Sequence, residues 1–207
     1  FREDINVKVW PVTMRTPDFP NVNWAFDFDG CMMQWNGGVQ VEKYSAEHEE
    51  YLRQLYGMLA EGHQTMTRIP VWDVVGMQKK SDGSWEFDFS RFDWYVKLCE
   101  EAGILHSLQV EELGHRLVPL WTSPMGLFVP VEIDGKMTKE TYPPDHPAVK
   151  DFYSSFIPAL RDHLKETGWA DRCYQQICDE PIDANAESYC QTVDLVRKYW
   201  PEMKVLE

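Results

Sequence analysis

The sequence has no run of 18 or more apolar residues, so no segment is long enough to cross a bilayer as a helix. Positive charge is also scarce, with 20 Lys and Arg residues against 34 Asp and Glu residues and a formal net charge of −14. Such a charge repels phosphate backbones, and no cluster of Lys and Arg offsets it. The sequence therefore argues against nucleic acid as a partner.

Several motifs of known chemistry are missing. Neither G-x-G-x-x-G nor G-x-x-x-x-G-K-[ST] occurs, which removes the main support for a nucleotide-binding doubly wound sheet. There is no G-x-S-x-G elbow and no cysteine motif that marks a nucleophile. The cysteines form no C-x-x-C pair, and their odd number cannot all pair internally. We expect buried, reduced thiols at Cys31, Cys99, Cys173, Cys178 and Cys190.

Aromatic residues, in contrast, are plentiful, with 9 Trp and an aromatic fraction of 14%. Indole rings fill cores, or they form flat apolar platforms with a polar edge that suit sugar rings. The residues that we expect to pack are Trp10, Trp94, Trp169 and Trp200. The candidates for sugar stacking, which we expect in loops next to strand ends, are Trp35, Trp72 and Trp121.

The two ends of the chain predict a segment of a longer protein. The sequence begins without Met, alternates apolar and polar residues from Ile5 to Val9, and brackets a polar stretch with Pro17 and Pro20. We expect residues 1–20 to be the end of an upstream β-domain and a linker. Residues 21–207 are expected to form the first part of a second domain.

Predicted strands and helices alternate along the rest of the chain. Short apolar runs predict strands at 24–28, 66–71, 104–110, 173–178 and from Val205 onward. Helical spacing and capping residues predict helices that begin after Ser45, Ser90, His146 and Asp183. We expect a long polar loop after the run at 66–71 and a β-hairpin at 128–139, where Asp134-Gly135 is a preferred two-residue turn.

The order of these elements predicts an α/β fold in which helices connect parallel strands. Such a repeat belongs either to a doubly wound sheet or to part of a (β/α)8 barrel. A complete barrel needs roughly 250 residues, so four to five units with long loops would make about half of one. We therefore expect a partial (β/α)8 TIM barrel with an inserted hairpin.

Carboxylates and aromatic residues follow the predicted strands, where a barrel builds its active site. These positions are Asp27, Asp29, Trp72, Asp73, Glu111, Glu112, Asp179 and Glu180. Glu111 and His115 are candidates for contacting sugar hydroxyls. Glu112 and His115 have the E-x-x-H spacing of di-metal helices, but that motif needs a helix and a second copy. We expect neither a metal nor a cofactor.

Asp179 and Glu180 are two acids side by side where a strand meets a loop. Repulsion and desolvation can raise the proton affinity of one while the other stays ionised, which is the division that a glycosidase needs. Both reach one pocket only if the strand ends there, as Pro181 indicates. The alternative is that the pair leads a loop and helps to cap the next helix.

Three segments carry a resemblance to a known family. They are Leu164–Asp171, Gln176–Pro181 and Val196–Lys204, which include the Gly-Trp-x-Asp and Asp-Glu-Pro elements, and Phe87–Asp93 is similar as well. Together they resemble the catalytic domain of glycoside hydrolase family 123 over most of the chain. The resemblance implies a (β/α)8 barrel behind an N-terminal β-domain, in a bacterial extracytoplasmic or secreted protein.

The resemblance also implies an activity, the removal of terminal β-linked N-acetylgalactosamine from a glycan or glycolipid by a substrate-assisted retaining mechanism. Glu180 is the implied general acid/base, and Asp179 is implied to orient the acetamido nitrogen and stabilise the oxazolinium. Such a mechanism needs no enzymic nucleophile. The implied partners of the segment are the remaining barrel strands and the upstream β-domain, so we expect the isolated segment to be inactive.

Two other functions remain open. One is a non-catalytic carbohydrate-binding barrel in which the acid pair only hydrogen-bonds sugar hydroxyls. The other is a conventional retaining glycosidase, which requires a second carboxylate about 5 to 5.5 Å from the first. Its nucleophile would lie beyond Glu207.

Overall fold

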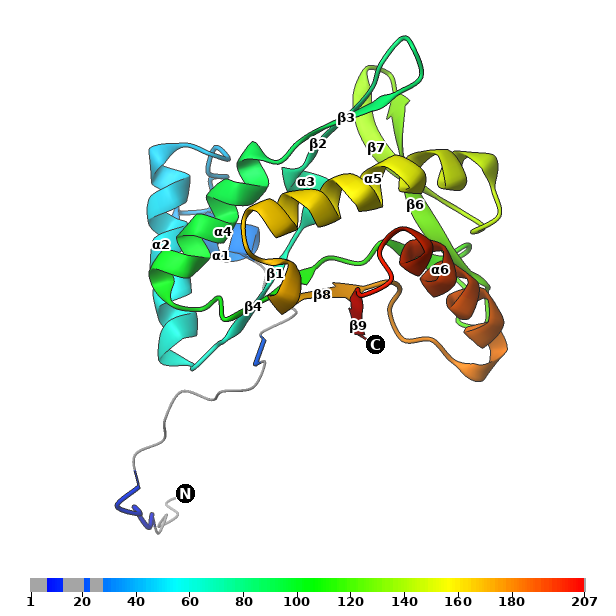
Figure 1. Cartoon of the computed structure of the whole chain (residues 1–207). Coiled ribbons are helices and arrows are strands. Elements are labelled where there is room, and N and C mark those ends of the chain that lie inside the picture. The colour runs from blue at the N-terminus through cyan, green and yellow to red at the C-terminus, as the bar shows by residue number, and fades with distance from the viewer. Residues whose placement is uncertain (1–6, 13–20, 23–27, 207) are drawn as a thin grey trace.

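A parallel sheet forms the centre of the computed structural model, which describes residues 7–12, 21–22 and 28–206 (Figure 1). All four of its strands run in the same direction, and their order in space follows their order in the chain. The strands are β1 (Met66–Ile69), β4 (Ser107–Val110), β8 (Cys173–Gln176) and β9 (Lys204–Leu206). The α/β class expected from the sequence is confirmed.

Helices precede or connect these strands. The long ones are α2 (Ala46–Glu61), α4 (Ser90–Ala102), α5 (Pro147–Glu166) and α6 (Ala186–Tyr199). The short ones are α1 (Phe28–Trp35), α3 (Val71–Val74), η1 (Ala170–Arg172) and η2 (Asp183–Asn185). Right-handed crossovers that step in one direction place their helices on one face of a sheet, and Figure 1 shows α4 and α5 on the same side of the strands. The apolar stripe of α5, including Phe152, Phe156 and Leu160, is fully buried.

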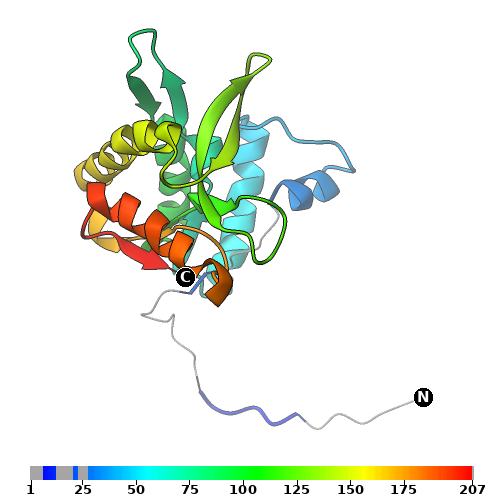
Figure 2. The same cartoon turned by 90° about the vertical axis from the view of Figure 1, so that its right-hand side faces the viewer.

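Two antiparallel units follow the carboxyl ends of β1 and β4. The first is the hairpin of β2 (Gly76–Lys79) and β3 (Trp85–Asp88). The second is a sheet of β5 (Gly114–Arg116), β6 (Met125–Ile133) and β7 (Lys136–Tyr142). Both hairpins project from the same end of the molecule, side by side (Figure 2). They therefore stand beyond the edge of the parallel sheet at which an α/β active site forms.

Local signals set several boundaries as predicted. The Ser45 hydroxyl accepts a hydrogen bond from the backbone N–H of His48 at 3.1 Å and caps α2. His146 caps α5 through its Nδ1 atom, ahead of Pro147. The turn at Asp134-Gly135 lies between β6 and β7, with both residues at positive φ, so the predicted hairpin is confirmed and extends further on both sides.

Two predicted helix caps are wrong. Ser90 is the first residue of α4 rather than its cap, and its backbone N–H donates to the Asp88 carboxylate at 2.9 Å. Asp183 opens η2, and α6 begins only after Asn185. The Asn185 side chain accepts a hydrogen bond from the Ile182 backbone N–H at 2.8 Å, which closes the η2 turn ahead of the helix.

Several strands also differ from their predicted extents. The run at 66–71 ends as a strand at Ile69, and the run at 173–178 ends at Gln176. The expected polar loop after β1 contains the β2–β3 hairpin, because Trp85 and Phe87 alternate with charged residues and pack inward. The turn of this hairpin contains Asp82-Gly83, a preferred turn pair, and Gly83 has a φ of 88°.

The N-terminal region and some tryptophans depart from expectation as well. Residues 7–12 form no strand, and Trp10 is 66% exposed rather than packed. The predicted linker at 13–20 lies outside the described residues, as do residues 24–27 of the first predicted strand. Phe28, the last residue of that strand, begins α1, and Trp35 ends this helix instead of lying in a loop.

The other packing predictions have mixed outcomes. Trp169 and Trp200 are buried, as predicted, while Trp94 is half-buried and stacks on the ring of His48. All five cysteines are free thiols. Cys190 is exposed on α6, which contradicts its predicted burial, and Cys31 is half-buried.

Candidate active site

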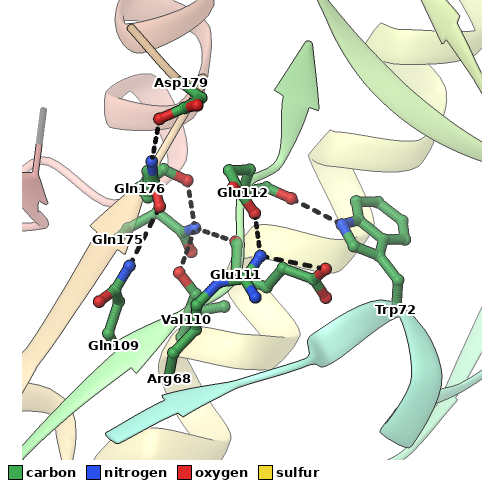
Figure 3. A network of polar contacts seen from close by, with 9 residues as sticks. All are labelled: Arg68, Trp72, Gln109, Val110, Glu111, Glu112, Gln175, Gln176 and Asp179. Carbon is green, nitrogen blue, oxygen red and sulfur yellow. Dashed lines mark hydrogen bonds and ion pairs between the residues drawn. The ribbon is translucent and has the colours of Figure 1, made fainter. Parts of the chain in front are cut away.

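A network of polar side chains crosses the carboxyl ends of three neighbouring parallel strands (Figure 3). Arg68 comes from β1, Gln109 from β4, and Gln175 and Gln176 from β8. The acids that follow β4 and β8 complete it. The parallel register therefore brings together residues that are far apart in the sequence.

Arg68 lies between the carboxylates of Glu111 and Glu112. Its Nη2 atom is 3.4 Å from Glu111 Oε1, and it forms a shorter ion pair with Glu112. Both glutamate side chains are only 16% exposed. One guanidinium thus compensates two acids that are largely removed from water.

The surroundings of the Glu111 carboxyl group change its proton affinity. Burial raises the pKa of Glu111, against the opposing effects of the Lys139 and Arg68 cations, and the neighbouring Glu112 and Asp73 charges raise it further. Its Oε2 atom is buried and has no hydrogen-bond partner in the described part of the chain. Glu111 therefore carries a buried acceptor whose hydrogen-bonding capacity is not used in the described part of the chain.

Trp72 lies at the Glu112 end of this network. It lies in α3 rather than in the expected loop, and its Nε1–H donates to the Glu112 backbone oxygen at 2.7 Å. Its half-buried ring packs against Phe128 and Phe156, with centroids 5.6 and 6.2 Å away. Part of the indole surface is thereby committed to the core.

A relay of glutamine amides leads from β4 to Asp179. Gln109 donates from Nε2 to Gln176 Oε1 at 3.0 Å, and Gln176 donates from Nε2 to Asp179 Oδ1 at 3.1 Å. The fully buried Gln175 donates from Nε2 to the Glu111 backbone oxygen at 2.8 Å. These amides fix the end of β4 against the end of β8 and orient one oxygen of Asp179.

Glu180 stands beside this relay in an unusual backbone conformation. Its φ is 46°, in the left-handed region that a residue with a side chain seldom adopts. Its backbone oxygen accepts a hydrogen bond from Arg116 Nη2 at 2.7 Å, so the arginine holds the turn. Within the described residues its exposed carboxylate makes no ion pair or hydrogen bond. The pair does not cap α6, which begins at Ala186 without a side-chain cap.

The other predicted contact residues divide into two groups. Trp121, 54% exposed in the β5–β6 loop, stacks over the Arg116 guanidinium at 4.0 Å and so stands near Glu180. His115 is exposed on the opposite face of β5 from Arg116, and Trp35 at the end of α1 packs against Tyr51 of α2. Neither of them contacts the network.

Sequence reasoning missed Arg68, Arg116 and the three glutamines. The available signal was a polar residue inside an apolar strand, as in Met-Thr-Arg-Ile. Among the described residues, no group of three or more His, Cys, Asp or Glu side chains is arranged to hold a metal ion. No helix in that part of the chain is long and apolar enough to cross a membrane.

These observations define an α/β domain whose parallel sheet carries an acidic, amide-supported site at its carboxyl edge. Residues 31–207 match the family model described as glycoside hydrolase 123, catalytic domain. The chain belongs to this family of glycoside hydrolases.

One solved structure supports the fold. It is a family 123 glycoside hydrolase from Clostridium perfringens, whose structural analysis concerns glycolipid glycan hydrolysis. The similarity has a TM-score of 0.61 at 18% identity and covers 86% of this chain. The chain spans only 33% of the length of that protein. No curated protein matches the sequence.

Proposed function

We propose that this chain supplies the first half of a (β/α)8 glycosidase barrel, with residues 1–20 belonging to an upstream β-domain and linker. The strand order β1-β4-β8-β9 supports this, because it advances in one direction without the reversal of a doubly wound sheet. The chain also spans only a third of its structural neighbour. Later strands of the full-length protein would close the barrel, so the 207 residues alone would not be active.

The proposed reaction is the release of terminal β-linked N-acetylgalactosamine from a neutral glycan or glycolipid glycan. The observation that carries it is the contrast within the acid pair: Asp179 is held by an amide, whereas the neighbouring Glu180 carboxylate is exposed. A carboxylate held in one orientation, Asp179, suits contact with the acetamido group, whereas the exposed carboxylate of Glu180 suits proton transfer. The glycolipid glycan context of the Clostridium perfringens enzyme fits this substrate class.

In the proposed mechanism the Glu180 carboxylic acid protonates the glycosidic oxygen as the bond to the anomeric carbon breaks. The carbonyl oxygen of the substrate's acetamido group attacks that carbon and forms an oxazolinium. Asp179, oriented by Gln176, accepts a hydrogen bond from the acetamido N–H and balances the positive charge. The Glu180 carboxylate then deprotonates the water that opens the oxazolinium, which restores the acid.

Contacts to the sugar are assigned to residues near this pair. Trp121 would stack on a sugar face, and Glu111, whose side chain is 16% exposed, would accept a hydroxyl hydrogen bond. Trp72 would border the site through its remaining exposed surface. His115 and Trp35 lie outside the network, and we assign them no contact.

The test compares two aryl β-galactosides in the full-length protein, one with a 2-acetamido group and one with a 2-hydroxyl group. Substrate assistance predicts turnover of the first and almost none of the second. Equal turnover of both, with a sugar trapped covalently on another carboxylate, would establish the conventional two-carboxylate mechanism instead. Binding of the amino sugar without any product would establish a carbohydrate-binding barrel.

A further inference from the structure

The lining residues place a groove of about 880 Å³ between the two projecting hairpins. Figure 2 shows these hairpins side by side. One wall is formed by β2 and β3, including Met77 and Glu86, and the other by β6 and β7, including Glu132 and Met137. Trp72 and Asp73 of α3 lie at its base. Its volume falls within the range of about 300 to 1,000 Å³ that ligand pockets occupy.

The base of the groove adjoins the polar network of the candidate active site. Trp72 lines the groove and also donates its Nε1–H to the backbone oxygen of Glu112. Lys139 lines the groove as well, and its Nζ atom lies 4.5 Å from the Phe128 ring centroid. The groove and the polar network therefore share Trp72.

The lining combines apolar surface with negative charge. Apolar contact is offered by Trp72, Val75, Met77, Pro130 and Met137. Four carboxylates, from Asp73, Glu86, Asp88 and Glu132, face a single ammonium, from Lys139. Sugars present apolar C–H faces to indole and thioether groups, while their hydroxyls donate hydrogen bonds to carboxylates.

The surrounding contacts show which of these carboxylates remain available. Glu86 is paired with Lys80 at 3.1 Å, and Asp88 accepts a hydrogen bond from the backbone of Ser90. Glu132 has no such partner in the described part of the chain, and its cross-strand neighbour is Met137. Glu132 and Met137 therefore present one acceptor and one apolar contact on the same wall.

We propose that this groove binds the leaving-group side of the substrate, and that its occupant is a neutral oligosaccharide. An anionic chain bearing carboxylates or sulfates would be disfavoured, because the lining and the net charge of −14 both repel it. The inference rests on the proposed function, since a leaving group exists only if the acid pair cleaves a glycosidic bond. It adds that the groove selects among substrates by the chemistry of their leaving-group side.

The experiment measures kcat/KM in the full-length protein for three substrates with the same terminal sugar. These are an aryl glycoside, a neutral oligosaccharide and the same oligosaccharide carrying a sulfate beyond the terminal sugar. For the wild type we expect the neutral oligosaccharide to be preferred over its sulfated form by roughly tenfold at low salt. The preference should shrink as salt is added, because screening weakens repulsion between exposed charges.

Two groove variants and a matched control complete the design. Met137→Ala is expected to lower the ratio of oligosaccharide to aryl turnover by roughly fivefold through lost apolar contact. Glu132→Lys is expected to remove most of the discrimination against sulfate. Glu140→Lys makes the same charge change on the same hairpin outside the groove, and we expect it to leave both ratios as in the wild type.

The outcomes separate this inference from the proposed function. A wild type that cleaves the aryl glycoside, with both ratios unaffected by Met137→Ala and Glu132→Lys, overturns the groove assignment alone. Equal effects of Glu132→Lys and Glu140→Lys overturn it as well, because they point to overall charge. A wild type that cleaves none of the substrates overturns the proposed function and this inference together. Turnover of the aryl substrate reports that each variant is folded.

Discussion

Two pairs of adjacent acids stand at the carboxyl ends of neighbouring strands, Glu111-Glu112 after β4 and Asp179-Glu180 after β8. The first pair shares the Arg68 guanidinium, and its side chains are mostly buried. In the second pair, Asp179 is held by the neutral amide of Gln176, and the Glu180 carboxylate is exposed. The two pairs look alike in the sequence but differ in their surroundings.

This difference separates structural acids from candidate catalytic ones. The Glu112 carboxylate is occupied by the Arg68 guanidinium, so it could reach a substrate oxygen only if this ion pair opened. The exposed Glu180 carboxylate has no such partner in the described residues. The comparison therefore favours Glu180 over Glu112 as the proton donor, and the predictions below test it.

The largest expected effect is that of Glu180→Gln in the full-length protein. Loss of a general acid/base should lower kcat/KM by about 10² to 10⁴. Azide, or a substrate with a leaving group that needs no protonation, should restore part of the rate. The matched change Glu112→Gln is expected to cost less than about tenfold, and an equal loss in both variants would end the distinction between the pairs.

Arg68→Met should produce the largest loss of stability, about 3 kcal/mol, because it leaves two mostly buried carboxylates without their cation. Gln176→Met removes two hydrogen bonds, the one to Asp179 and the one from Gln109, but leaves no ion pair broken, and should cost about 2 kcal/mol. Urea denaturation of the two full-length variants measures both values. Similar losses would mean that the ion pairs around Arg68 contribute no more than the amide relay.

Trp72→Phe tests the link between the Glu111-Glu112 pair and the groove. The change keeps an aromatic ring against Phe128 and Phe156 but removes the donor to the Glu112 backbone oxygen. We expect a loss of about 1 kcal/mol in the free energy of unfolding. A thermal shift indistinguishable from that of the wild type would show that this hydrogen bond does not hold the end of β4.

The smallest expected effect is on the pH dependence of stability. Burial raises the pKa of Glu111 in the folded protein above its ordinary value of 4.5. The folded state therefore binds this proton more tightly than the unfolded state, and the resulting stabilisation, complete below pH 4.5, is lost as pH rises through the folded pKa. Glu111→Gln lacks this titration.

The stability of the Glu111→Gln variant relative to the wild type should therefore rise between about pH 4 and neutrality. Denaturant midpoints of both proteins across that range measure the difference. A constant difference would show that Glu111 titrates alike in the folded and unfolded states, and the two acid pairs would then be less distinct than their contacts indicate.

Local chemistry explains most of what the sequence predicted about the fold. Pro147 fits the first turn of a helix, and Asp134-Gly135 fits a two-residue hairpin turn, so α5 and the β6–β7 hairpin follow from neighbouring residues alone. The β2–β3 hairpin was missed because its polar outer face resembles a loop. Its inward residues become recognisable as strand residues only through burial against α5 and its neighbours.

The site was predictable only in part, for a physical reason. Strand ends located Asp179 and Glu180, since a short apolar run followed by proline marks where a strand stops. Arg68 lies 43 residues before Glu111 in the chain, and only the register of β1 against β4 brings them together. Composition and spacing carry no information about such pairing.

The left-handed backbone at Glu180 has a consequence for how this position evolves. An L-residue in this region costs about 1 kcal/mol relative to glycine, which adopts it freely. Selection for stability alone would therefore favour glycine here, and selection for an acid would oppose it. Under the proposed function a glutamate at this backbone position exchanges stability for activity, and we expect glycine at the matching position of any relative that lacks the activity.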